Sequence, residues 1–266
     1  MANEQVPVII LCGGFGSRLH EESEFRPKPM LEIGGQPILW HIMKLYSFYG
    51  LRKFILCLGY KGFMIKNYFL NYHAYLADMT VRLGQPQRVD YHNSHGEEDW
   101  EVTLVETGEG AQTGARVARA GKYVQSDTFC LTYGDGLAHI DISRLLEFHR
   151  KHGKVGTITG VRPPGRFGEL EVDGKGRAIH FNEKPQVTDG LINGGFLVLQ
   201  RDFLDRYVKD DDTCVLEQEP LMRLARDGEL MTYVHEDFWQ PMDTYREWKF
   251  LNELWAKGHA PWKVWR

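Results

Sequence analysis

Residues 11–19 read Leu11-Cys-Gly-Gly-Phe-Gly-Ser-Arg-Leu19, and the chain continues to Pro27-Lys28-Pro29. The apolar run from Val6 to Leu11 predicts a buried strand that enters a tight turn. Glycines in such a turn allow backbone N–H groups to approach phosphates closely. Two other phosphate loops do not fit, because a dinucleotide GxGxxG motif would need glycine where Leu19 stands, and the GK[ST] of a Walker loop is absent.

Two cations accompany this glycine loop, Arg18 directly behind it and Lys28 between two prolines. Arginine can bind two phosphate oxygens with its planar fork, whereas lysine is a compact charge suited to one phosphoryl group. This division of roles suits cleavage of a triphosphate. The alternative is a glycine turn with solvated charges, but the prolines on both sides of Lys28 restrict its backbone.

On both sides of the loop, stretches with the apolar pattern of a strand alternate with stretches with the apolar pattern of a helix. The first 70 residues read strand, loop, helix (37–49), strand (54–58) and helix (62–71), the pattern of a parallel sheet covered by helices. Residues 79–106 predict an antiparallel or edge excursion, and the alternation returns at 128–161 and continues to a last helix at about 244–257. We expect a Rossmann-like α/β fold with a mixed, mostly parallel central sheet.

Composition limits the function further. The 266 residues, of which 42% are apolar, suit a single catalytic domain over 1–266. The formal net charge of -4 provides no basic field for nucleic acid, and no membrane partner is expected, because neither a signal peptide nor a long apolar span is visible. We expect a cytoplasmic protein whose four cysteines are reduced.

Two aspartates follow predicted strands. Asp135 lies in Tyr133-Gly-Asp135-Gly, and Asp243 lies in Gln240-Pro-Met-Asp243 before a helix. Ligands of open parallel sheets bind beyond the carboxyl ends of the strands, and a triphosphate-bound Mg²⁺ takes one or two carboxylates there. The alternatives are an ordinary turn aspartate for Asp135 and an ordinary helix N-cap for Asp243.

A third cluster joins Glu183-Lys184-Pro185 to Asn193-Gly194-Gly195. An acid and a base side by side can hold a hydroxyl and a phosphate, and Asn-Gly-Gly offers exposed amides to a sugar. Taken alone the pattern is weak, because Lys-Pro and Asn-Gly are common in turns.

In their order along the chain, these motifs resemble the sugar-phosphate nucleotidyltransferases, and within that family the glucose-1-phosphate cytidylyltransferases. Further matching stretches include Lys28 to Met43, Pro164 to Gly168, Glu217 to Met222 and Phe238 to Thr244, so the resemblance covers nearly the whole chain. It implies a Rossmann-like fold, an oligomer that is hexameric in this subgroup, and a product used for cell-surface polysaccharides.

The resemblance also implies roles for residues. Lys28 would stabilise the attacked α-phosphate, Arg18 and Arg116 would meet the triphosphate, and Asp135 and Asp243 would hold Mg²⁺. The nucleotide would be bound by Leu11, Gly13, Gly14, Gly16, Ser17, Thr107, Gly108, Thr113 and Arg116. The sugar phosphate would be bound by Gly168, Glu183, Lys184, Asn193 and Gly194.

The expected reaction is in-line attack of glucose 1-phosphate on the α-phosphorus of CTP, which gives CDP-glucose and pyrophosphate. Catalysis would then consist of positioning and charge neutralisation. Two alternatives stay open: the same fold with dTTP, UTP or another phosphorylated acceptor, and a regulatory module that binds nucleotide sugars without catalysis.

Overall fold

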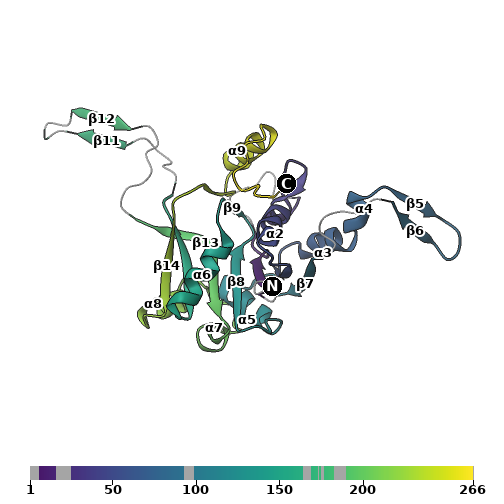
Figure 1. The fold of residues 1–266 in the computed structure, drawn as a ribbon, viewed down its shortest axis with the longest axis horizontal. Helices are drawn as coiled ribbons and strands as arrows, with labels where there is room; N and C mark the ends of the chain where they lie inside the picture. The colour runs from purple at the N-terminus through teal and green to yellow at the C-terminus, as the bar shows by residue number, and fades with distance from the viewer. Residues whose placement is uncertain are drawn as a thin grey trace.

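The computed structural model describes residues 6–15, 25–92, 99–163, 169–172, 174, 177–182 and 190–265. Its centre is a seven-stranded sheet in the order β14-β10-β13-β8-β1-β4-β7 (Figure 1). β13 runs antiparallel to both of its neighbours, and the other pairs in this sheet are parallel. The strands are β1 (Val8–Leu11), β4 (Lys53–Leu58), β7 (Glu101–Glu106), β8 (Thr128–Tyr133), β10 (Gly156–Val161), β13 (Ile192–Gln200) and β14 (Leu230–His235).

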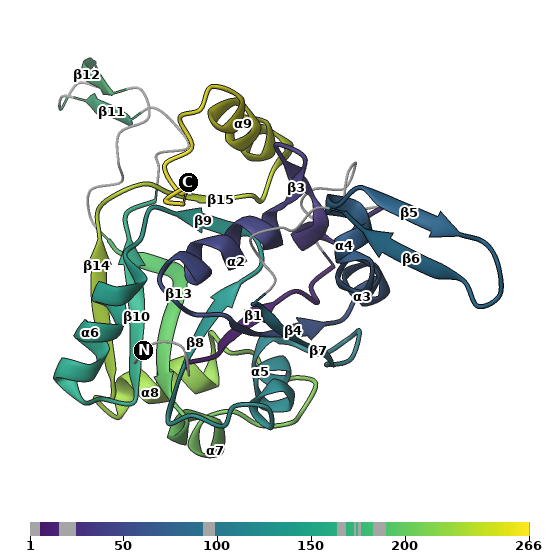
Figure 2. The same cartoon turned by 45° about the vertical axis from the view of Figure 1, so that its right-hand side comes forward.

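Helices cover both faces of this sheet, as Figure 2 shows. β1 is buried on both sides, since Val8 and Ile10 belong to one apolar cluster and Ile9 and Leu11 to the other. The first cluster includes α2 (Ile38–Phe48) and α6 (Ile142–His152). The second includes α5 (Thr113–Gly121), α7 (Asp202–Arg206) and α8 (Glu219–Arg226). The predicted mixed, mostly parallel α/β fold is confirmed.

Local signals set the ends of several helices. α6 begins after Asp141, whose carboxylate accepts a hydrogen bond from the Arg144 N–H at 3.0 Å, and it ends at His152, before Gly153 with φ of 64°. α9 (Tyr245–Ala256) begins with a capping box between Thr244 and Glu247. The N-cap of this helix is therefore Thr244, which removes the alternative that Asp243 is an ordinary N-cap.

The region 79–106 differs in part from the prediction. β5 (Met79–Arg82) and β6 (Arg88–Tyr91) form the expected antiparallel ribbon. β7, in contrast, pairs parallel with β4 at the edge of the central sheet, so the excursion ends before it. The alternating pattern of β7 reflects an edge strand that is only partly covered.

Smaller elements complete the described chain. β9 (Gly136–Ala138) pairs with β15 (Trp239–Pro241) close to the core, whereas β5–β6 projects from the body in Figure 1. The others are η1 (Lys28–Met30), β2 (Glu32–Ile33), β3 (Gln36–Pro37), α3 (Gly62–Leu70), α4 (Tyr72–Leu76), β11 (Glu169–Val172) and β12 (Ala178–Asn182). Among the described residues, no helix combines the length and apolarity that a membrane span would need.

Candidate active site

The site lies beyond the carboxyl ends of β1 and β8, where the parallel strands leave a crevice. The loops after the two strands touch: the Gly134 N–H donates to the Leu11 carbonyl at 3.0 Å. A Cβ on Gly134 would lie 2.7 Å from that oxygen, so only glycine fits. A cavity of about 420 Å³ opens beside this contact.

Lys28 lies between the two predicted metal-binding aspartates. Its Nζ atom is 2.6 Å from Asp135 Oδ2 and 2.5 Å from Asp243 Oδ1, and only 11% of its side chain is exposed. Burial lowers the pKa of Lys28, but the charges and hydrogen bonds of Asp135 and Asp243 outweigh burial and raise it above its usual value. Lys28 therefore carries a firmly held positive charge.

The β9–β15 ribbon brings the two aspartates together. Asp135 directly precedes β9, and its carbonyl accepts a hydrogen bond from the Met242 N–H at 2.8 Å. Pro241 pairs with Gly136, so the register of the ribbon places Asp243 beside Asp135. The Glu247 carboxylate then fixes the turn by accepting the N–H groups of Asp243 and Thr244, each at 2.8 Å.

These two carboxylates fit a divalent cation. The Lys28 ammonium lies between the two carboxylates, which shows that they can hold a positive charge there. Two carboxylates together with phosphate oxygens and water are a common ligand set for Mg²⁺. Among the residues that the structure describes, no group of three or more His, Cys, Asp or Glu side chains forms a self-sufficient metal site. A cation held by these two carboxylates would take its remaining ligands from phosphate oxygens and water.

Of the residues predicted to bind nucleotide, Leu11, Gly13, Gly14, Thr113 and Arg116 line the cavity. A Cβ on Gly13 would lie 2.2 Å from Arg116 Nη1 and 2.9 Å from the Gly59 backbone nitrogen, so a side chain there would displace the Arg116 guanidinium. Further lining residues had no predicted role, among them Phe15, Gln112 and Tyr133.

Arg116 is 4% exposed, and its guanidinium is bonded within the chain. Nη2 donates to the carbonyls of Gly13 and Glu109, and Nη1 donates to the carbonyls of Leu58 and Gly108 and to Thr107 Oγ1, at 2.8–3.1 Å. In this structure Arg116 joins the glycine loop to residues 107–109. Its predicted contact with the triphosphate stays a prediction.

Thr107 and Gly108 lie behind the cavity lining. The Thr107 hydroxyl is fully buried and donates to the Leu58 carbonyl at 2.5 Å. Gly108 has φ of 91°, a conformation that favours glycine. Both residues accept hydrogen bonds from Arg116, which lines the cavity. Their predicted contact with the nucleotide also stays a prediction.

On the sugar side, Asn193 and Gly194 stand at the start of β13. The Asn193 Nδ2 donates to the Tyr133 hydroxyl at 3.2 Å, and the Gly194 carbonyl accepts from Trp239 Nε1 at 2.7 Å. Asn193 thus connects to the cavity through Tyr133. Gly16, Ser17, Arg18, Gly168, Glu183 and Lys184 lie outside the described residues, and their predicted roles stay predictions.

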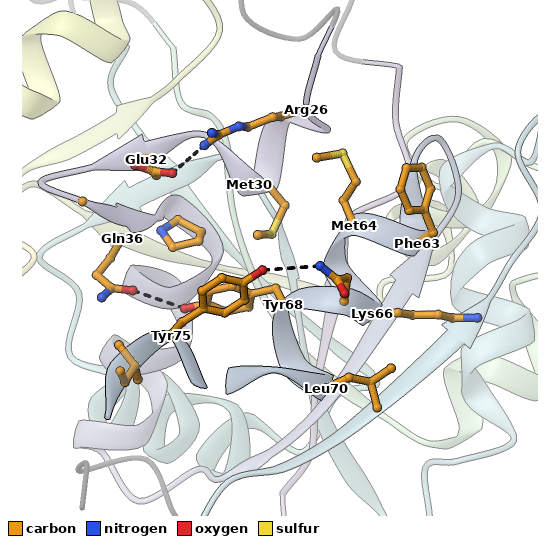
Figure 3. Close-up of a pocket in the computed structure, with 14 residues that line it drawn as sticks. Arg26, Met30, Glu32, Gln36, Phe63, Met64, Lys66, Tyr68, Leu70 and Tyr75 are labelled. Carbon is orange, nitrogen blue, oxygen red and sulfur yellow. Dashed lines mark hydrogen bonds and ion pairs between the residues drawn. The ribbon is translucent and has the colours of Figure 1, made fainter. Parts of the chain in front are cut away.

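A larger cavity of about 810 Å³ lies elsewhere, against α3 and α4 (Figure 3). Met30, Phe63, Met64 and Leu70 contribute apolar surface, and Arg26 and Glu32 at its rim form an ion pair with each other at 2.5 Å. This cavity has the greater volume but does not contain the Lys28–aspartate cluster. The described residues that are predicted to carry the chemistry therefore line the smaller cavity.

Comparisons with known proteins identify the family of this chain. Residues 7–244 match the family described as nucleotidyl transferase. The chain is 50% identical over 258 residues to a glucose-1-phosphate cytidylyltransferase of Salmonella typhi, covering 97% of this chain and 98% of that one. It is 44% identical over 265 residues to a probable glucose-1-phosphate cytidylyltransferase of Bacillus subtilis, covering 97% and 99%.

Among solved structures, HddC from Yersinia pseudotuberculosis is similar in fold, with a TM-score of 0.68, 23% identity and coverage of 94% of this chain and 99% of that one. At that identity the likeness concerns the fold alone. The family match extends over both the glycine loop and Asp243, and with the two relatives above it shows that this chain belongs to the nucleotidyl transferase family.

Proposed function

We propose that this protein transfers a cytidylyl group from CTP to α-D-glucose 1-phosphate and forms CDP-glucose and pyrophosphate. The observation that carries the proposal is the position of Lys28 between Asp135 and Asp243 at the cavity. The names of the relatives at 44–50% identity support the choice of CTP and glucose 1-phosphate.

In the proposed reaction, a phosphate oxygen of the sugar phosphate attacks the α-phosphorus of CTP. The bond from that phosphorus to the pyrophosphate oxygen breaks, and pyrophosphate leaves with the bonding electrons. Lys28, a protonated amine at neutral pH, neutralises charge that develops on the α-phosphate. Asp135 and Asp243 would hold Mg²⁺, which supplies further positive charge against the phosphate oxygens.

The remaining residues would bind and orient the substrates. Leu11, Gly13, Gly14, Thr113 and Arg116 line the cavity on the side proposed for the nucleotide. Asn193 and Gly194 lie on the side proposed for the sugar phosphate. A glycine loop with close backbone approach suits phosphate oxygens, because N–H groups can reach them without obstruction from Cβ atoms.

A substrate panel tests this proposal. Purified protein is incubated with Mg²⁺, glucose 1-phosphate and, in turn, CTP, dTTP, UTP, ATP and GTP, and pyrophosphate release is followed. We expect the highest kcat/KM with CTP. Preference for another nucleotide would reassign the donor, and binding of CTP with no pyrophosphate release from any sugar phosphate would indicate a regulatory binding protein instead.

We further propose that the chain forms a homo-oligomer through the β5–β6 ribbon. The register pairs Met79 with Tyr91 and Val81 with Val89, so these four side chains share one face of the ribbon. All four are 40–46% exposed. A two-stranded ribbon with an uncovered apolar face is marginally stable in water, and a second copy of the chain would cover it.

Sedimentation equilibrium checks this assembly. We expect the wild-type protein to sediment as an oligomer and Val81→Glu to shift it toward the monomer. Gln87→Glu, which adds the same charge to the exposed turn of the same ribbon, is the matched control and should leave the assembly unchanged. A monomeric wild-type protein would rule the proposal out.

A further inference from the structure

A chain of hydrogen bonds connects the two halves of the site through Glu217. Glu217 lies in the segment before α8, and its Oε2 accepts the Thr113 hydroxyl at 2.7 Å. Its Oε1 accepts the Tyr133 hydroxyl in a short hydrogen bond. Tyr133 in turn accepts from Asn193 Nδ2 at 3.2 Å. One carboxylate therefore connects α5, the end of β8 and the start of β13.

The direction of each hydrogen bond follows from the groups involved. The Thr113 hydroxyl accepts the Leu216 N–H at 2.9 Å, so its proton is directed to Glu217. The Tyr133 hydroxyl donates its proton to Glu217 Oε1, because an ionised carboxylate only accepts hydrogen bonds. A lone pair of the phenol oxygen is then available to Asn193.

The same chain fixes the amide of Asn193. Its Oδ1 accepts the Gly195 N–H at 2.8 Å, and one Nδ2 proton is used on Tyr133. One amide proton and one oxygen lone pair of Asn193 are not used in these two contacts, and the contacts with Tyr133 and the backbone set the orientation of the amide. Thr113, at the other end of the chain, lines the cavity on the nucleotide side.

The segment that carries Glu217 is also attached to the start of α5 through its backbone. The backbone before it is attached to the start of α5, because the Cys214 carbonyl accepts the N–H groups of Gly114 and Ala115 at 2.9 and 3.1 Å. The Asp212 carbonyl accepts the Gln112 N–H at 2.9 Å. These backbone hydrogen bonds do not involve the Glu217 carboxylate, so replacing the carboxylate leaves their donors and acceptors in place.

We propose that Glu217 is a positioning residue that orients Thr113 for the nucleotide and, through Tyr133, Asn193 for the sugar phosphate. This inference rests on the proposed function, since that function places the two substrates on these two sides. In the sequence, Glu217 is noted only as part of the stretch Glu217 to Met222 that resembles the family, and no role was predicted for it.

Steady-state kinetics of three variants test the chain of contacts. Glu217→Ala removes both acceptor oxygens and should raise KM for both substrates roughly 10-fold, judging by hydrogen bonds to charged groups, with kcat changed less than about threefold. Tyr133→Phe breaks the path to Asn193 alone and should raise only the sugar phosphate KM. Thr113→Val should raise only the nucleotide KM.

Glu219→Gln is the matched control, because Glu219 is exposed and lies at 3.7–3.8 Å from Arg223 and Lys209 on the surface. It should leave both KM values unchanged. Equal KM effects of Tyr133→Phe on both substrates, or unchanged KM values in Glu217→Ala, would overturn the inference. The KM values of wild type and variants are compared with the substrate pair that the wild-type protein prefers. An error in the proposed substrates therefore does not decide this test.

Discussion

The ribbons β9–β15 and β5–β6 have the same local structure and opposite surroundings. In β9–β15, Leu137, Ala138 and the adjoining Met242 are fully buried, and the ribbon holds Asp135 and Asp243 at the cavity. In β5–β6 all eight residues are exposed. The difference shows that strand pairing alone does not fix side chains in the positions that a binding site needs. The core under β9–β15 fixes the carboxylates, whereas β5–β6 offers its apolar face outward.

The largest effect on activity is expected from loss of the Lys28 charge, which lies between the two aspartates held by β9–β15. Lys28→Ala is expected to lower turnover roughly 10²-fold or more while the protein stays folded, because a charge-stabilising donor is lost. Pyrophosphate release measures turnover, and circular dichroism checks the fold. Lys151→Ala, which removes an exposed lysine paired with Glu147, is the control. Near-normal turnover of the Lys28 variant would remove this residue from the mechanism.

Truncation of a buried side chain tests the support under β9–β15. Met242→Ala should cost about 2–5 kcal/mol of unfolding free energy, because Met242 is 0% exposed and its loss leaves a cavity. Urea unfolding measures the change. A loss below about 0.5 kcal/mol, the range usual for surface positions, would mean that the ribbon is not fixed by its core.

Acid should weaken the same supported region. His41 is fully buried, and burial lowers its pKa to about 4. Its Nε2 is 2.8 Å from the Ile33 carbonyl, and its Nδ1 accepts from Trp262 Nε1 at 3.3 Å. Trp262 stacks on Phe238, next to β15. The neutral ring with its proton on Nε2 satisfies both contacts, whereas a second proton on Nδ1 would oppose the Trp262 N–H.

The sign of the pH effect follows from the depressed pKa. Unfolded His41 takes up a proton near pH 6.5 but the folded ring does so only near pH 4, so stability is lost as pH falls through this window, by up to about 3 kcal/mol. Urea unfolding from pH 7 to pH 4 measures the slope. His41→Asn should flatten it in part, since His149 has a similarly lowered pKa. An unchanged slope in His41→Asn would contradict the assignment.

The smallest effect is expected on the exposed ribbon. Thr80→Ala, on the polar face of β5–β6, should change the unfolding free energy by no more than about 0.5 kcal/mol, because every residue of β5 is exposed. The same urea assay used for Met242→Ala provides the measurement. A cost of 2 kcal/mol or more would show that this face is packed, and would erase the contrast between the ribbons.

Local sequence patterns predicted most strands and helices and failed where a pattern was ambiguous. The α/β alternation predicted β1, α2, β4 and α3 with small shifts at their ends. α5 was not predicted, because Gly114 and Gly121 are weak helix formers and the buried Arg116 interrupts its apolar stripe. β7 was placed in the excursion, since its parallel partner β4 is distant in sequence.

The sequence by itself determined the chemical groups and where they stand relative to strands: a glycine loop, Lys28 between prolines, and an aspartate after each of two strands. Only the tertiary structure decided that Asp135 and Asp243 meet at Lys28, and that Glu217 connects Thr113 to Tyr133. The physical reason is that short-range patterns fix the ends of elements. The pairing of distant segments depends on which side chains the common core buries.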